Sequence, residues 1–212
     1  MANILIVGAG WLGAPLAQTL ADQGHHVTVT RRSQSRLDEL PITSVRTAQL
    51  DLSEPIAQQK IVELIKQEQI ERIVGSFPPG FRKGNGQEYA QQWQRLVEAA
   101  KVSGVEKLLM VSSTTVYPNL PVDMREEDAT FALAQDNPHF SDNARIMLQA
   151  EQYVMDSGID YAIVRCSGLI GADRHPSRFA LRLKQVSRKA PANMVHQNDA
   201  VAATAFALNQ IE

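Results

Sequence analysis

The sequence predicts an α/β fold in which a parallel β-sheet carries helices on both faces. Short apolar runs of strand length alternate along the chain with longer amphipathic stretches of helical periodicity. This alternation is typical of a parallel sheet wrapped by helices. The runs near the start and middle are apolar without a polar residue at every second position, which indicates strands covered on both faces.

The expected elements follow one another along the whole chain. Strands are expected, in chain order, at 3–7, 26–30, 44–50, 72–76, 107–112, 161–165 and 193–197. The first helix carries Leu12, Leu16 and Leu20 at intervals of one helical turn, which predicts a face packed on the core. Longer helices are expected at 87–103 and 142–157, and their apolar faces predict core packing or, alternatively, a dimer contact.

Composition limits the class of protein. A chain of 212 residues, 44% of them hydrophobic, can form one sizeable core, so we expect a single domain over residues 1–212. The net charge of −2 argues against a nucleic-acid or anionic-membrane surface spread over the protein. The single cysteine, Cys166, excludes an internal disulfide and leaves no ligand set for structural zinc, so no metal site is expected. Without a signal-peptide pattern or a membrane-spanning run, the expected location is cytoplasmic.

Three glycines, Gly8, Gly10 and Gly13, form the pattern G-x-G-x-x-G between the first expected strand and the first expected helix. Gly8 permits a tight turn, Gly10 lets the backbone approach a pyrophosphate, and Gly13 lets helix and strand pack closely. Together with Trp11 and Leu12 they are the expected pyrophosphate-binding residues at the helix N-terminus. The alternative is a glycine-rich turn without a ligand. The context of strand and helix favours a Rossmann-type, doubly wound sheet that binds a dinucleotide.

Two arginines, Arg31 and Arg32, follow the second expected strand. In sites that prefer NAD, an acidic residue at this place binds the ribose 2′-hydroxyl. Guanidinium groups instead bind a 2′-phosphate through charge-assisted hydrogen bonds, so the pair predicts NADP(H), with NAD(H) possible and a solvated basic strand end as the alternative. Asp51 and Leu52, after the third strand, are expected near the adenine, and Asp51 also fits the start of a turn.

Further motifs resemble those of the extended short-chain dehydrogenase/reductase family, the NAD(P)-dependent epimerases and dehydratases. They are VGAGWLG, SFPPG, VSSTTVYP, RCSGLIG and VHQNDAVAA, and together they extend over nearly the whole chain. The resemblance implies the Rossmann-type fold and adds Phe77, Pro78 and Ser112 to the expected cofactor-binding residues. It also implies a possible homodimer through the helices at 87–103 and 142–157.

The resemblance implies catalytic roles for Ser113 and Arg145. Ser113 matches the family residue that orients the substrate carbonyl or hydroxyl. The family's Tyr-x-x-x-Lys pair is not present: matched on the downstream Ala-Glu, Ser141 takes the tyrosine place and Arg145 the lysine place. Arginine can hold the cofactor ribose but does not readily lose a proton, and serine is a poor acid near neutral pH. Tyr117 and His139 are the alternative proton carriers.

A second departure from the family concerns the substrate side. Family members usually continue past the segment matched by residues 195–208 with a small lobe over the substrate, so the substrate lobe is expected to be reduced or absent. Arg174 and Arg178 stand near the place where the family binds the diphosphate of nucleotide sugars, with a solvated basic face as the alternative.

Two functions therefore stay open. One is an NADP-dependent oxidoreductase or epimerase acting on a sugar nucleotide or a similar hydroxylated metabolite. The other is an NADP(H)-binding regulatory or scaffold protein without turnover. Both take a dinucleotide as partner, and neither needs a nucleic acid or a membrane.

Overall fold

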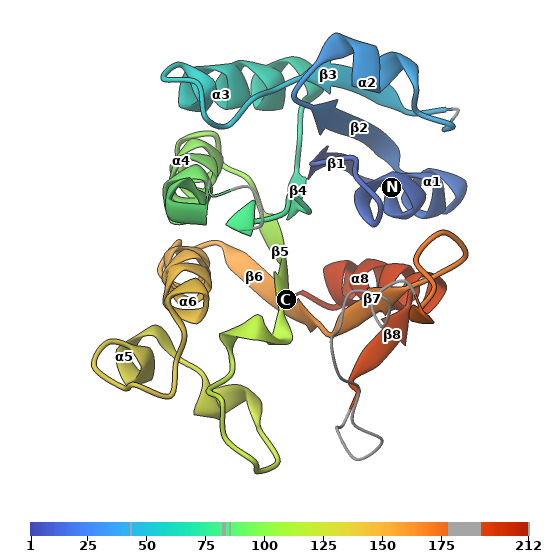
Figure 1. Ribbon diagram of the computed structural model, residues 1–212. Coiled ribbons are helices and arrows are strands. Elements are labelled where there is room, and N and C mark those ends of the chain that lie inside the picture. The colour runs from blue at the N-terminus through green and yellow to red at the C-terminus, as the bar shows by residue number, and fades with distance from the viewer. Residues whose placement is uncertain (43, 82–83, 85, 178–191, 212) are drawn as a thin grey trace.

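The computed structural model describes residues 1–42, 44–81, 84, 86–177 and 192–211, which form a three-layer α/β structure (Figure 1). The central sheet contains β1 (Asn3–Val7), β2 (His26–Arg31), β3 (Arg46–Gln49), β4 (Arg72–Gly75), β5 (Lys107–Ser113) and β6 (Asp160–Cys166). All its neighbours pair in parallel, in the order β3-β2-β1-β4-β5-β6. The strand order reverses between β1 and β4, and open α/β sheets bind ligands at the carboxyl ends of strands at such a point.

Helices cover both faces of the sheet (Figure 1). One face carries α1 (Gly13–Asp22) and α8 (Gln197–Gln210), which contact each other. The other face carries α3 (Ala57–Glu68), α4 (Tyr89–Val102) and α6 (Asp142–Met155), with α4 between its two neighbours. Shorter helices are α2 (Gln34–Asp38), α5 (Phe131–Ala134) and the 3₁₀ turns η2 (Gly86–Glu88), η3 (Thr114–Val116) and η4 (Glu126–Asp128). The predicted doubly wound Rossmann-type sheet is confirmed.

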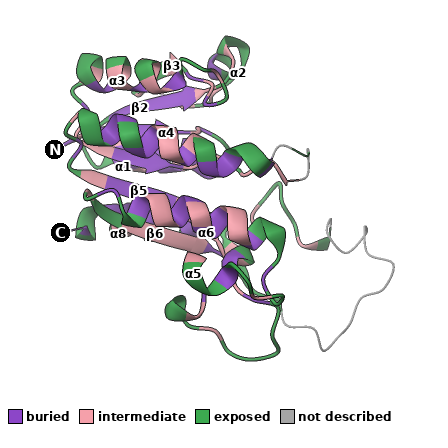
Figure 2. Ribbon diagram, turned by 90° about the vertical axis from the view of Figure 1, so that its left-hand side faces the viewer, coloured by how far each residue is buried: buried purple, intermediate pink, exposed green. Residues whose placement is uncertain are grey.

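The core lies on both sides of the sheet, and β1 shows how it is divided. Ile4 and Ile6 pack in the cluster beneath α1 and α8, whereas Leu5 and Val7 pack in the cluster beneath α3, α4 and α6. Figure 2 shows buried, purple residues along β2 and β5 and exposed, green residues on the helices. The apolar runs without alternation are therefore explained by cover on both faces.

Two strand predictions differ from the structure. The third strand is shorter than the predicted 44–50, because its ladder with β2 includes only Arg46–Gln49. The seventh expected strand exists as β8 (Met194–His196), but it pairs with β7 (Gly168–Ile170) in a separate two-stranded sheet. The sequence pattern predicted the strand β8 but did not identify β7 as the strand with which it pairs. None of the helices in the described ranges is long and apolar enough to cross a membrane.

Candidate functional site

The turn between β1 and α1 gives its three glycines different surroundings. Gly8 has a φ of +100°, and a Cβ there would lie 2.7 Å from the carbonyl oxygen of Ser76. A Cβ on Gly13 would lie 2.2 Å from the carbonyl oxygen of Gly8, so α1 packs directly on the turn. At Gly10 a Cβ would meet no described atom within 4 Å. Backbone packing therefore fixes two glycines, and the third leaves the open approach that a pyrophosphate needs.

Polar contacts from β2 hold this turn in place. The N–H of Gly8 donates to Thr30 Oγ1 at 3.3 Å, and the N–H of Ala9 donates to the Thr30 carbonyl at 2.9 Å. Arg31 Nε donates to the Ala9 carbonyl at 2.6 Å, while its Nη1 donates to the Arg36 carbonyl at 2.8 Å. The Arg31 side chain thus joins the turn to α2.

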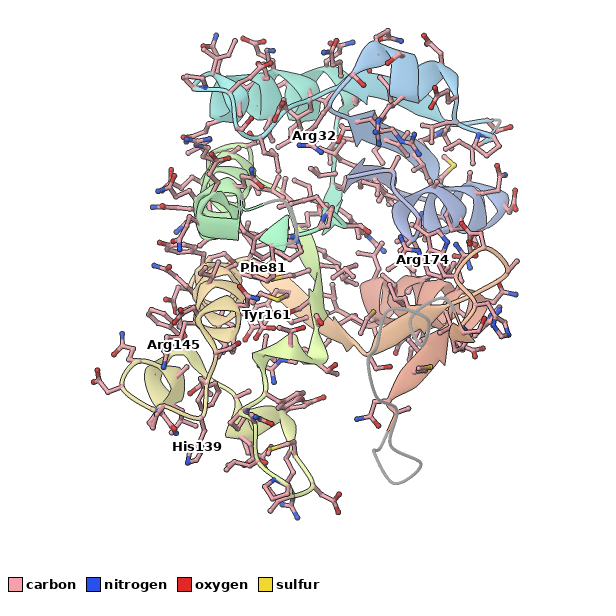
Figure 3. All side chains as sticks on the ribbon, in the orientation of Figure 1. Arg32, Phe81, His139, Arg145, Tyr161 and Arg174 are labelled. Atoms are coloured by element: carbon pink, nitrogen blue, oxygen red, sulfur yellow. The ribbon has the colours of Figure 1, made fainter. Side chains whose placement is uncertain are left out.

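Arg32 differs from Arg31 although the two are adjacent. Its side chain is exposed near the end of β2 (Figure 3), and within the described parts of the chain its carbonyl, but not its guanidinium, makes a hydrogen bond. Its charge acts on Asp51: partial burial raises the pKa of this carboxyl, but hydrogen bonds from Ser53 and the charges of Arg32 and Lys60 outweigh burial and leave the pKa below its usual value. Of the two arginines, Arg32 is thus the more exposed one, and Arg31 is the one held by the chain itself.

Asp51 and Leu52 follow β3, where an adenine was predicted. Asp51 Oδ1 accepts from the N–H of Ser53 at 3.0 Å and from its hydroxyl at 2.7 Å, which is the turn that the sequence also indicated. Leu52 is buried, and its carbonyl accepts from Arg95 Nη1 at 2.7 Å. The turn does not use Asp51 Oδ2, so the two predictions for Asp51 are compatible.

The segment after β4 stands beside the glycine turn. A Cβ on Gly8 would lie 2.9 Å from the backbone nitrogen of Phe77, so the two backbones approach closely. The Phe77 ring stacks on Trp93 with centroids 5.0 Å apart and meets Tyr89 edge-on at 5.6 Å. Pro78 follows and is exposed. An aromatic cluster from α4 thus holds Phe77, one of the expected cofactor-binding residues, at the strand-order reversal.

Ser112 and Ser113 end β5 and point to different partners. Ser112 is buried, and its hydroxyl donates to Glu151 Oε1 of α6 at 2.5 Å. Ser113 is half-buried at the carboxyl end of the strand, where its Oγ accepts from the N–H of Thr115 at 3.1 Å and caps η3. Of the two hydroxyls, that of Ser113 lies at the edge where ligands bind in open α/β sheets.

A buried ion pair that the sequence analysis missed lies behind Ser112. Glu151 is only 2% exposed, and its Oε2 lies 2.7 Å from Arg165 Nη2 of β6. Arg165 also donates to the carbonyls of Glu126 at 2.8 Å and Ala129 at 2.7 Å, so it anchors the long loop after β5. Burial alone would lower the Arg165 pKa, but Glu151 and Tyr117 raise it above its usual value. A charge on the apolar face of a predicted helix was the available signal for this pair.

The positions matched to the missing tyrosine and lysine form contacts at the start of α6. Ser141 caps this helix by accepting from the N–H of Ala144 at 3.1 Å. Arg145 donates from Nε to the Ala134 carbonyl at 2.8 Å, from Nη2 to the Asn137 carbonyl at 2.9 Å, and from Nη1 to Asp142 at 2.9 Å. Each nitrogen of this guanidinium thus donates a hydrogen bond to a residue between 134 and 142. The catalytic role of Arg145 stays a prediction that these contacts do not support.

The two alternative proton carriers have different surroundings. The Tyr117 ring is half-buried, and the Arg165 guanidinium carbon lies 5.2 Å from its centroid. His139 is exposed in the loop before α6, where its carbonyl accepts from the N–H of Asn119, and Figure 3 shows it well away from Phe81. Of the two, Tyr117 is nearer in the chain to the end of β5.

Trp11 connects the glycine turn to the C-terminal part of the chain. Its indole Nε1 donates to Asp173 at 2.6 Å, and its carbonyl accepts from Gln197 at the start of α8 at 2.7 Å. The Arg174 guanidinium lies 4.3 Å from the Trp11 ring centroid, beside α1 (Figure 3). Arg178, the second arginine predicted for a diphosphate, lies outside the described residues.

Further reactive groups are Cys166 and the side chains that can bind a metal ion. Cys166 is buried in the core beneath α8, and burial raises the pKa of its thiol, so it is a small core residue rather than a nucleophile. Over the described ranges, no group of His, Cys, Asp and Glu side chains is arranged to hold a metal ion.

Comparisons with known proteins agree with this geometry. A family model described as NAD(P)H-binding matches residues 8–210. The chain belongs to this NAD(P)H-binding family. Protein YeeZ of Escherichia coli (strain K12) is 28% identical over 210 residues, which are 98% of this chain and 73% of YeeZ.

Solved structures of this NAD(P)H-binding fold are also similar. The UDP-glucose 4-epimerase of Thermus thermophilus, solved with NAD, has a TM-score of 0.78 at 19% identity, and the match covers 99% of this chain and 75% of that one. The Bordetella bronchiseptica enzyme WbmH, solved with NAD+, has a TM-score of 0.75 at 20% identity, with 99% and 73% covered. The resemblance to the epimerase/dehydratase group is confirmed for the fold, and the chain is shorter than these neighbours.

Proposed function

We propose that the chain binds NADP(H) and does not use the tyrosine–lysine proton relay of the epimerase/dehydratase group. The exposed Arg32 at the end of β2 is the observation that carries the cofactor choice. A 2′-phosphate at this place gains charge-assisted hydrogen bonds from a guanidinium, whereas the acidic residue that favours NAD is missing. Gly10 leaves the approach for the pyrophosphate, and the N-terminus of α1 favours its negative charge.

The contacts of Ser141 and Arg145 support the second part of this proposal. One is a helix cap and the other anchors the preceding loop, so neither is left to move a proton or to hold a ribose. Binding without turnover, as a regulatory or scaffold protein in the cytoplasm, is the function that this arrangement favours.

A second candidate is an NADP-dependent oxidoreductase or epimerase acting on a sugar nucleotide or similar hydroxylated metabolite. Ser113 favours it, because its hydroxyl stands at the carboxyl end of β5, where the group orients a substrate oxygen. Bound dinucleotide would supply the hydride chemistry, and Ser113 would orient the reacting oxygen. NADPH oxidation with a carbonyl substrate that is lost in Ser113→Ala would establish this candidate over binding alone.

Calorimetric titration with NADPH and NADH tests the cofactor. We expect NADPH to bind at least about tenfold more tightly, because one charge-assisted hydrogen bond contributes roughly 1.5–3 kcal/mol. Arg32→Gln should remove this preference by weakening NADPH alone. Arg46→Gln, the same change at the exposed amino end of β3, is the matched control and should leave both affinities unchanged. Equal affinities in the unaltered protein would contradict the proposal.

A further inference from the structure

The backbone of Trp11 belongs to the glycine turn, but its side chain lies against a part of the chain 162 residues further on. Residues 171–174 form a tight turn there. The N–H of Arg174 donates to the Gly171 carbonyl at 3.0 Å, and the N–H of Gly171 donates to the Arg174 carbonyl at 3.4 Å. This 171–174 turn follows β7 and lies beside α1 (Figure 1). Trp11 therefore joins the expected cofactor turn to the segment after β7.

Three different contacts hold the indole of Trp11 on this turn. Its Nε1 donates to Asp173 Oδ1 at 2.6 Å, and the Arg174 guanidinium carbon lies 4.3 Å from its ring centroid. A Cβ on Gly171 would lie 2.8 Å from Trp11 Cζ2, so the glycine lets the ring approach the backbone closely. A hydrogen bond, a cation–π contact and close packing thus fix the same side chain.

The backbone of Trp11 is held from the same side. Its carbonyl accepts from Gln197 Nε2 at 2.7 Å, and Gln197 is the first residue of α8. An added Cβ on Gly171 would also lie 3.4 Å from the Gln197 Cβ. Because β8 directly precedes α8 and pairs with β7, the two-stranded sheet, α8 and the glycine turn all meet around Trp11. A displacement of the 171–174 turn would therefore reach the glycine turn through this residue.

We propose that the 171–174 turn positions the dinucleotide-binding turn through Trp11, so that dinucleotide binding and order in residues 168–174 are coupled. This inference rests on the dinucleotide binding proposed above. A pyrophosphate at the start of α1 needs the backbone of Trp11 in one conformation. An indole that is already fixed reduces the freedom that this backbone loses on binding, which raises affinity. Because such coupling is reciprocal, bound dinucleotide stabilises the contacts of the 171–174 turn to the same extent.

Arg174 is a positioning residue in this proposal, which differs from direct binding of a diphosphate. A cation that touches the ligand acts on affinity whether or not the indole is present. A cation that acts through the indole has no effect once the indole is removed. Substitutions of Arg174 and Trp11, alone and together, therefore separate the two roles.

The first test measures NADPH and NADH affinities by calorimetry in these variants. Arg174→Gln should weaken both dinucleotides about threefold, as expected from the loss of one exposed cation–π contact. Arg174→Lys keeps a cation over the ring and should retain both affinities. Trp11→Leu should weaken both by about threefold or more, and adding Arg174→Gln to it should cause no further loss. Arg125→Gln, at an exposed arginine of the loop after β5, is the control and should change neither affinity.

Hydrogen exchange provides a second measurement that does not depend on activity. Saturating NADPH should slow amide exchange across residues 168–174 of the unaltered protein. In the protein without ligand, Gly171→Ala should speed exchange across residues 8–14, because the added Cβ displaces the indole. Circular dichroism confirms that each variant is folded.

Two results would overturn the proposal. One is an equal loss of affinity from Arg174→Gln with and without the indole, which would make Arg174 a direct ligand contact. The other is exchange across residues 168–174 that NADPH does not change.

Failure of the proposed cofactor choice looks different from failure of this coupling. The choice is contradicted by equal affinities for NADPH and NADH, whereas loss of the 171–174 contacts weakens both dinucleotides alike and leaves their ratio unchanged. If the unaltered protein binds neither dinucleotide, the proposed function fails. Exchange across residues 8–14 in Gly171→Ala then decides whether the 171–174 turn positions the glycine turn, and unchanged exchange overturns it.

Discussion

The β1–α1–β2 half of the sheet and the β5–α6 half meet at the same carboxyl edge, but their polar groups are used differently. In the first half, Gly10 is open and Arg32 is exposed. In the second half, the polar groups of Ser112, Glu151 and Arg145 all contact other parts of the chain. The cofactor half thus keeps groups for a ligand, whereas most of the second half uses its polar groups to hold loops and helices.

This difference explains how a chain can keep a dinucleotide fold without the usual proton relay. The glycine turn needs only backbone geometry and one cation, and neither depends on α6. Ser113 differs from the other polar residues of the second half in its place, because its hydroxyl, which also caps η3, lies at the carboxyl edge of the sheet. Substitutions in the β5–α6 half should therefore mainly lower stability. Substitutions in the β1–α1–β2 half should mainly weaken dinucleotide binding.

The largest expected effect is on stability, from Glu151→Ala. Removing this carboxylate leaves the half-buried Arg165 without its ionic partner, and breaking such a pair costs about 3–5 kcal/mol. Urea unfolding measures the change in the free energy of unfolding. Glu98→Ala, which removes an exposed acid from α4, is the control and should change it by less than about 0.5 kcal/mol.

The double variant Glu151→Leu with Arg165→Met sharpens this test. Removing both charges leaves no uncompensated ion, so the double variant should be more stable than Glu151→Ala. Equal losses in the two variants would show that shape, rather than the ion pair, determines stability at this place.

The second prediction concerns substitutions of Gly13 and Gly10 in the cofactor half. Gly13→Ala places a methyl group 2.2 Å from the Gly8 carbonyl oxygen, so we expect a loss of about 1–3 kcal/mol in stability together with loss of dinucleotide binding. Gly10→Ala meets open space and should leave stability unchanged, but it should weaken binding because the methyl group occupies the pyrophosphate approach. Thermal unfolding and calorimetry on both variants separate the two effects.

The third prediction separates the two arginines. Arg31→Gln removes the contacts to Ala9 and Arg36 and should weaken NADPH and NADH alike, by roughly 1 kcal/mol, because the turn loses its anchor. Arg32→Gln should weaken NADPH alone. If Arg31→Gln instead affects only NADPH, the phosphate partner is Arg31 and the assignment to Arg32 is wrong.

Local backbone requirements made much of the fold predictable from the sequence. The structure shows the tight turn expected at Gly8 and the close packing expected at Gly13, where positive φ and nearby backbone atoms leave few other residues possible. The strand at 193–197 was found, but its partner β7 was not, since pairing joins segments far apart in the chain. Arg31 and Arg32 look equivalent in the sequence, and only the contact of Arg31 with the Ala9 carbonyl separates them.

The smallest effect is expected at the place matched to the missing tyrosine. Ser141→Ala removes the cap of α6 and should cost about 1 kcal/mol in stability, because the N–H of Ala144 loses its acceptor. Ser141→Asp keeps an acceptor for this N–H and should therefore retain the stability that Ser141→Ala loses. Neither change should alter NADPH affinity or any NADPH oxidation, since Ser141 acts at the helix start and not at the cofactor. A fall in oxidation rate for both variants, at unchanged stability for Ser141→Asp, would place Ser141 in the reaction after all.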